Sequence, residues 1–395
     1  GVSFRLPGQR VRDDEEQSPL PPTVARRFRA KLLARSHPDR IPRFCEGHRT
    51  SLTLKANNDL MKTALPIPKQ IAAIRSAVNG YKLSQVLMTV EELGVFSALS
   101  VQPLPLELLG ATVSCPPSRL QPLVDALVAH GFLARGSEGY SIASGFSTLD
   151  VGHPASQLGY LRYASTVSGK WKRLGDAARA TTVAEENFAG ITGGDAAHTE
   201  AFTAAMHANA APQVAFLRRN FDFAGRSILD VGGGRGTYSV AAAKEWPACS
   251  AEILDLPSVA ELAKEAVQEE GVSANCSVIL GDYLSTLPNG PYDDVFLFAV
   301  IHQHSSEETL RLLTEIRRRL RPGGRLLLSS FFLDDDRTSP PFSVMFAIEM
   351  LVMVPDGRVY THSELEQLLK KAGFSDPPER RDDVPGPATW YIAHV

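Results

Sequence analysis

A cluster of glycines directly follows a short apolar segment that contains one aspartate. Residues 227–239 read Ser-Ile-Leu-Asp-Val-Gly-Gly-Gly-Arg-Gly-Thr-Tyr-Ser, in which Ile228, Leu229 and Val231 suit a buried parallel strand. The turn that follows contains Gly232, Gly233, Gly234 and Gly236. Glycines in a turn allow the backbone to bend sharply and to approach a ligand closely. The pattern therefore predicts a nucleotide-like ligand where a strand meets a helix.

The spacing of these glycines distinguishes a site that binds a pyrophosphate from other kinds of nucleotide site. The pyrophosphate fingerprint Gly-x-Gly-x-x-Gly requires a glycine or alanine at the position where this chain has Thr237. The spacing is instead Asp-x-Gly-x-Gly-x-Gly, from Asp230 to Gly236. It resembles motif I of class I S-adenosylmethionine-dependent methyltransferases, and the resemblance implies S-adenosylmethionine as the cofactor.

After Asp230 the chain alternates between strand and helix patterns. Strands are expected at residues 227–231, 251–255, 276–280, 293–300, 325–331 and near 389–394, and helices at 258–270, 306–320 and 362–372. This alternation predicts an α/β fold with a Rossmann-like, doubly wound sheet. A ligand of such a sheet lies beyond the carboxyl ends of the strands, so residues just past the first four strands are expected to line it.

Those four places carry residues that suit a nucleoside. Past the second strand, Asp255 can accept hydrogen bonds from both ribose hydroxyls. Past the third, Asp282 can accept from an adenine amino group and Tyr283 can stack on the ring. A single aspartate at a strand end is often a helix cap, so the prediction depends on the order of all four places. The expected cofactor contacts are Asp230, Gly232, Gly233, Gly234, Gly236, Asp255, Leu256, Gly281, Asp282 and Tyr283.

The chain before the sheet divides into two regions. Residues 1–65 are rich in arginine and proline with an acidic run at 13–16, which predicts a disordered tail, with an organelle-targeting segment as the alternative. Residues 66–220 show helical apolar stripes and then a hairpin pattern around the turn at 136–139, which is typical of a winged helix. The helix expected at 118–130 has one basic residue, Arg119, so we predict dimerisation and a substrate wall, not nucleic-acid binding.

The composition is that of a globular protein with no global preference for an acidic or basic partner. The chain has 395 residues, 44% of them hydrophobic, and a net charge of −3. Its four cysteines are scattered and no apolar run reaches the roughly 18 residues that span a bilayer. We therefore predict a cytoplasmic protein with no membrane association.

A resemblance to a known family covers the chain from about residue 70 to its end. It rests on Asp-Val-Gly-Gly-Gly-Arg-Gly (230–236), Asp-Leu-Pro (255–257), Gly-Asp-Tyr (281–283), the histidine at 302, Arg-Pro-Gly-Gly-Arg-Leu-Leu-Leu (321–328), Leu-Gly-Val-Phe-Ser-Ala-Leu (93–99) and His-Gly-Phe-Leu (130–133). These motifs resemble the small-molecule O-methyltransferase family that includes plant caffeate and animal hydroxyindole enzymes. The resemblance implies a homodimer, a methyltransferase domain at residues 221–395 and a small organic acceptor.

The resemblance also implies that His302 is the general base that deprotonates the acceptor hydroxyl, a task suited to an imidazole. Its surroundings depart from the plant pattern, because Gln303 and His304 stand where those enzymes have Asp and Trp. In plant members two glutamates orient the histidine. The matching positions of this chain lie near Ser330 and Val359, and neither side chain is expected to perform that role.

This departure leaves two alternatives open. His302, Gln303 and His304 could contribute to a metal site that assists carbon methylation of an α-keto acid. The winged helix could instead belong to a non-catalytic regulator that senses the cofactor and binds DNA.

Residues that match the acceptor wall of relatives lie on both sides of the glycine motif. We predict that acceptor contacts come from Phe202, Met206, His207, Met345, Phe346, Glu349 and Met350. Such side chains would form an apolar pocket that suits an aromatic acceptor.

Overall fold

The structure is a computed structural model that describes residues 65–179, 196–354, 357–375 and 377–395. The predicted disordered tail at residues 1–65 lies almost wholly outside the described residues. Within the described ranges, no helix is both long and apolar enough to cross a membrane.

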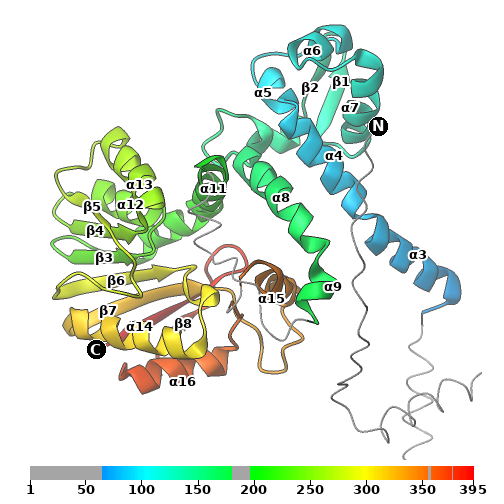
Figure 1. Cartoon of the computed structure of the whole chain (residues 1–395). Coiled ribbons are helices and arrows are strands. Elements are labelled where there is room, and N and C mark those ends of the chain that lie inside the picture. Colours follow the sequence, from blue (N-terminus) through cyan, green and yellow to red (C-terminus); the bar gives the residue numbers. More distant parts are fainter. Residues whose placement is uncertain (1–64, 180–195, 355–356, 376) are drawn as a thin grey trace, which may run out of the picture. The chain divides into compact units, whose positions relative to one another are not determined.

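The C-terminal half is built on one sheet, which contains seven strands within the described residues (Figure 1). In chain order they are β3 (Ser227–Val231), β4 (Ser250–Asp255), β5 (Cys276–Leu280), β6 (Tyr292–Phe298), β7 (Leu320–Ser330), β8 (Glu379–Arg381) and β9 (Thr389–His394). Their order across the sheet is β5-β4-β3-β6-β7-β9-β8. Strands β3 to β7 pair in parallel and β9 pairs antiparallel with both of its neighbours. The predicted Rossmann-like fold is confirmed.

The topology locates the ligand site. The chain order reverses between β3 and β6, which lie side by side, and ligands of doubly wound sheets bind at such a switch point. The loops that follow these two strands hold the glycine cluster and His302.

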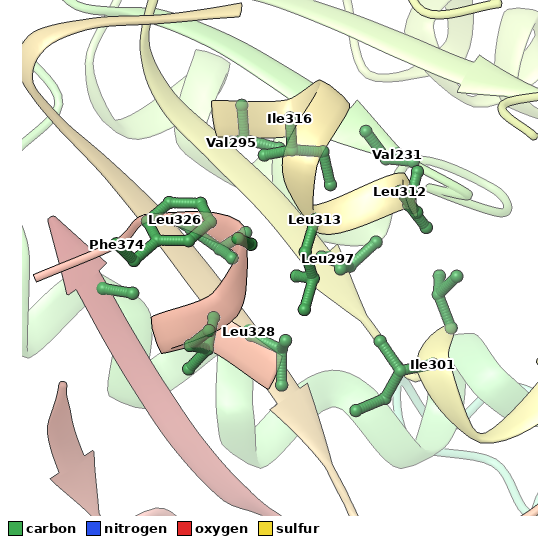
Figure 2. Close-up of a cluster of buried hydrophobic side chains, with 14 of the residues drawn as sticks. Val231, Val295, Leu297, Ile301, Leu312, Leu313, Ile316, Leu326, Leu328 and Phe374 are labelled. Carbon is green, nitrogen blue, oxygen red and sulfur yellow. The ribbon is translucent and has the colours of Figure 1, made fainter. Parts of the chain in front are cut away.

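Helices cover both faces of the sheet. They are α11 (Ala196–Asn220), α12 (Thr237–Glu245), α13 (Pro257–Glu269), α14 (Ser306–Arg319) and α16 (His362–Ala372). Helix α15 (Pro341–Met353) packs instead in a separate apolar cluster with Val167 and Leu333. Along β6, Val295 and Leu297 pack toward α14, while Phe296 and Phe298 pack toward the opposite face. Figure 2 shows the α14 side, where Leu313 lies over Leu297 and its neighbours. Burial on both faces explains why these strands are continuously apolar.

The N-terminal half is mainly helical. It contains α3 (Ile67–Asn79), α4 (Tyr81–Glu92), α5 (Val95–Leu99), α6 (Leu106–Thr112), α7 (Pro117–Ala129), the hairpin β1 (Leu133–Gly136) and β2 (Gly139–Ile142), the 3₁₀ helix η1 (Ser144–Leu149), α8 (Leu158–Trp171) and α9 (Leu174–Ala177). The predicted hairpin is confirmed, with Leu133 opposite Ile142 and the turn at residues 136–139. Phe96, Leu120 and Tyr140 are among the side chains that fill the core between α4, α7 and the hairpin.

The sheet differs from the sequence prediction in three details. Strand β7 begins at Leu320, before the strand expected at 325–331. The strand expected at 293–300 ends at Phe298 because Ala299 adopts a left-handed conformation, with φ of +58°. The sheet also gains β8 at its edge, which has the all-charged sequence Glu-Arg-Arg and therefore no apolar alternation by which to predict it.

Candidate active site

The glycine turn connects β3 to α12 at the switch point of the sheet. Gly232 and Gly236 have positive φ values of +66° and +78°. A Cβ atom on Gly232 would lie 2.8 Å from Val300 Cγ2, and one on Gly236 would lie 2.5 Å from Ile253 Cδ1. A side chain at either position would therefore strain the backbone and require its neighbours to shift.

Asp230 supports this turn from behind. Its carboxylate is 1% exposed and accepts a hydrogen bond of 2.7 Å from the hydroxyl of Ser239, in the first turn of α12. A Cβ atom on Gly233 would lie 2.7 Å from Asp230 Cγ, so the loop packs directly on the carboxylate. Burial raises the pKa of Asp230 to about 7, and the hydrogen bond from Ser239 opposes that rise. Direct contact between Asp230 and the cofactor stays a prediction.

Asp255 and Asp282 lie at the ends of β4 and β5. Asp255 Oδ2 accepts from the amide of Gly234 at 2.8 Å, and Oδ1 accepts from the amide of Leu256 at 2.7 Å. Burial raises the pKa of the Asp255 carboxyl, although these two amides counter it. Asp282 is exposed and accepts from the Leu284 amide and the Ser285 hydroxyl. Each carboxylate oxygen keeps a second lone pair that could accept from a ribose or adenine.

Tyr283 is held by His304. The Tyr283 hydroxyl lies 2.8 Å from His304 Nε2, and the two rings meet edge to face at 5.6 Å. The His304 carbonyl in turn accepts a hydrogen bond of 2.9 Å from the hydroxyl of Tyr360. A Cβ atom on Gly232 would lie 3.3 Å from Tyr283 Cε1, so the tyrosine ring lies against the glycine turn. The pair orients the flat side chain that was predicted to stack on adenine.

His302 lies in the short 3₁₀ helix η2 (Ile301–Gln303), just beyond β6. Its ring is 7% exposed and meets the ring of Phe346 edge to face, with centroids 4.9 Å apart. Burial, and secondarily the charge of His304, lower the pKa of His302 to about 3. The imidazole is therefore neutral at physiological pH and available to accept a proton.

Neither position that corresponds to a plant glutamate supplies a charge to His302, although Ser330 contacts its ring. Ser330, at the end of β7, lies with its Oγ 3.3 Å from His302 Nδ1, so its hydroxyl can orient the ring. It supplies no charge, unlike a glutamate. Val359 is buried and apolar, as expected, and the Gln303 side chain donates to the Ala299 carbonyl.

The metal hypothesis gains no support from the geometry. His302 and His304 follow β6 in a 3₁₀ turn, where the first ring contacts Ser330 and the second contacts Tyr283. Within the described ranges no group of three His, Cys, Asp or Glu side chains is arranged to hold a metal ion.

The predicted acceptor residues fall into different surroundings. Phe346 contacts His302, and Phe202 of α11 packs on Tyr163 of α8 with ring centroids 5.3 Å apart. Met350 is buried in a cluster with Val167 and Leu333, whereas Met206 and Met345 are exposed.

His207 lies on the cofactor side of the site. Its Nδ1 is 2.9 Å from the Thr237 hydroxyl, at the start of α12. Partial loss of water contact, and then the charge of Arg235, lower the pKa of His207. His207 therefore contacts the helix that follows the glycine turn.

The aromatic residues Tyr163, Phe331 and Phe342 were not among the predicted contacts. Phe331 lies 4.7 Å from Phe346 and 4.9 Å from Phe342, between centroids. Their aromatic side chains would suit contacts with an acceptor, but aromatic residues of the core show the same sequence pattern.

Comparison with known proteins identifies the family. The model of the O-methyltransferase domain matches residues 171–375, and that of the O-methyltransferase dimerisation domain matches residues 76–149. The chain is 30% identical to the tetracenomycin polyketide synthesis 8-O-methyl transferase TcmO of Streptomyces glaucescens, over 82% of this chain and 96% of the relative. It is 27% identical to the acetylserotonin O-methyltransferase of Rattus norvegicus, over 81% of this chain and 76% of that protein.

A solved structure extends the comparison. Human N-acetylserotonin methyltransferase in complex with SAM superposes with a TM-score of 0.74 and 25% identity, over 84% of this chain and 99% of the human chain. None of these matches supports the carbon-methylation or DNA-binding alternatives.

The buried state of His302 predicts a pH effect on stability. Below about pH 6.5 the unfolded chain protonates this ring, whereas the folded protein does so only near pH 3. The folded state therefore loses stability as pH falls through this window, by up to about 1.4 kcal/mol per pH unit from this group. In His302→Gln this contribution disappears. Urea unfolding at pH 7.5, 6.0 and 5.0 should show the variant gaining stability relative to the wild type as pH falls; parallel curves would contradict the prediction.

The hydrogen bond between Tyr283 and His304 predicts coupled effects on cofactor affinity. Tyr283→Phe and His304→Gln should each weaken binding of S-adenosylhomocysteine about three- to tenfold, since one hydrogen bond contributes roughly 0.5–1.5 kcal/mol. The double variant should lose little more than either single variant. Calorimetric titration measures this, with Tyr81→Phe at an exposed position as the control. Additive losses would show that the two side chains act separately.

Proposed function

Because this chain belongs to the S-adenosylmethionine-dependent O-methyltransferase family, whose members act on small molecules, we propose that it methylates a hydroxyl of a small aromatic acceptor with His302 as the proton acceptor. The observation that carries this proposal is the position of His302. Its neutral ring follows β6 at the switch point, contacts Ser330 through Nδ1 and faces the ring of Phe346.

The residues at the switch point fit the cofactor. A Cβ atom on Gly234 would meet no atom within 4 Å, so the turn is open at this position; Asp255 has acceptor capacity for ribose hydroxyls, and Tyr283 offers a flat ring. We propose that these residues bind S-adenosylmethionine together with Gly233, Gly234, Leu256, Gly281 and Asp282. When bound, the cofactor supplies a methyl group already activated by a sulfonium.

The low pKa of His302 determines when the proton moves. A free phenol has a pKa of about 10, so transfer of its proton to a ring with a pKa of about 3 would cost about 10 kcal/mol. Deprotonation before methyl transfer is therefore unfavourable. A phenolic O–H becomes far more acidic as its oxygen forms a bond to carbon, and His302 then accepts the proton. Before that step the ring orients the hydroxyl by accepting its hydrogen bond.

The match to the dimerisation domain supports a homodimer. We propose that α3 contributes to the dimer contact. Its apolar residues Ile67, Ile71, Ile74 and Val78 recur at helical spacing, and all four are exposed in the single chain. The domain boundaries at residues 66–220 and 221–395, and the cytoplasmic location, stay predictions.

The proposed role of His302 predicts a loss in turnover. His302→Gln should lower kcat by about 10²- to 10⁴-fold, the usual contribution of general acid–base catalysis, while affinity for S-adenosylhomocysteine stays within about twofold of the wild type. Ser330→Ala should lower kcat about three- to tenfold through a less fixed ring. Methyl transfer to a panel of phenols, followed by mass spectrometry, gives both values. Wild-type turnover in His302→Gln would exclude this histidine as the proton acceptor.

The exposed stripe of α3 predicts the effect of charge on assembly. The double change Ile71→Glu and Ile74→Glu should increase the monomer fraction, because a carboxylate is costly to bury in an apolar contact. Light scattering after size exclusion at several protein concentrations measures this, with Lys69→Glu on the same helix as the control. An unchanged dimer would show that this stripe is not part of the contact.

A further inference from the structure

Helix α15 is apolar along its length except for one acid. Its sequence, Pro-Phe-Ser-Val-Met-Phe-Ala-Ile-Glu-Met-Leu-Val-Met, contains Glu349 as the only charged residue. Glu349 follows Phe346 by three positions and precedes Met353 by four, so all three lie on one face of the helix. Phe346 contacts the ring of His302, and Met353 is buried. Glu349 therefore lies one helical turn from the side chain that faces the proton acceptor.

The neighbouring helix α8 presents aromatic rings to this acid. Tyr163 packs in one apolar cluster with Met350, the residue that follows Glu349 in α15. Burial, and then the charge of Glu349, raise the pKa of the Tyr160 and Tyr163 hydroxyls. Tyr163 also packs in the same apolar cluster as Phe346, and its ring meets that of Phe202. The acid thus belongs to a helix that packs on aromatic side chains, and the face of an aromatic ring attracts cations.

Among the described residues, no positively charged side chain forms an ion pair with Glu349. The carboxyl is partly buried, which raises its pKa, and it forms neither an ion pair nor a hydrogen bond with any described residue. The guanidinium groups of Arg162 on α8 and Arg358 after α15 pair with Glu91 and Glu364 instead. A carboxylate withdrawn from water without a partner is unfavourable. Its presence beside the site indicates that a ligand supplies the missing partner.

We propose that Glu349 binds a protonated amine of the acceptor, with Tyr160, Tyr163 and Phe202 contacting the cation through their rings. This inference rests on the proposed function and narrows its acceptor to an aromatic hydroxyl compound that also carries a basic nitrogen. The carboxylate pairs with the ammonium while the hydroxyl lies at His302.

Matched ligands test the inference through binding. The protein loaded with S-adenosylhomocysteine is titrated calorimetrically with 4-(2-aminoethyl)phenol and with 4-ethylphenol, which lacks only the amine. The wild type should bind the amine at least tenfold more tightly. Glu349→Gln, which keeps the shape of the side chain, should remove this preference and leave affinity for 4-ethylphenol within about twofold. Glu261→Gln, which removes an exposed charge on α13, is the control and should keep the preference.

The outcomes separate this inference from the proposed function. Equal affinity for the two phenols in the wild type, or a preference that survives in Glu349→Gln, overturns the role of Glu349 even if both phenols are methylated. A preference that depends on Glu349, without methyl transfer to any hydroxyl compound of the panel, supports the binding role and counts against the proposed reaction. Thermal unfolding of Glu349→Gln confirms that the variant is folded before either conclusion is drawn.

Discussion

The hydrogen bond between the Ser239 hydroxyl and the buried carboxylate of Asp230 is the contact on which the site depends. It holds the first turn of α12 against the end of β3. The glycine turn, which connects these two elements, is thereby fixed at both of its ends. From that turn, an amide reaches Asp255, and a glycine lies against the ring of Tyr283. Tyr283 is bound to His304, two residues from the proton acceptor. One set of contacts thus positions both the cofactor loop and the catalytic segment.

Burial shifts the titratable groups of this site toward their neutral forms. It raises the pKa of Asp230 and of Glu349 and lowers that of His302. The shared cause is the loss of water around each group. A site of this kind strengthens every interaction with a bound charge, because the competing solvent is absent. The same loss of water that makes His302 a weak base would strengthen the proposed pairing of Glu349 with a cation.

Local patterns in the sequence were sufficient for the sheet and for the order of the polar residues at its edge. Apolar runs such as residues 227–231 are continuous because both faces are buried, and each strand end is marked by an acid or a histidine. Contacts between distant segments were not predictable in this way. Ser330 and His302 are 28 residues apart in the sequence. They come into contact because β6 and β7 are neighbours in the sheet. Tyr163 reaches the site from a helix whose aromatic residues are indistinguishable in sequence from core residues.

The surroundings of His302 determine where catalytic power comes from. A glutamate or aspartate beside an imidazole would stabilise its cation and strengthen it as a base. Here Ser330 fixes the ring without charge, and burial disfavours the cation further. A weak base is sufficient only if the oxygen, the methyl group and the ring are already aligned, and alignment of this kind can supply roughly 7–11 kcal/mol of a barrier. On the roles proposed above, the aromatic side chains around His302 and the carboxylate of Glu349 contribute to catalysis by holding the acceptor in the geometry that a weak base requires.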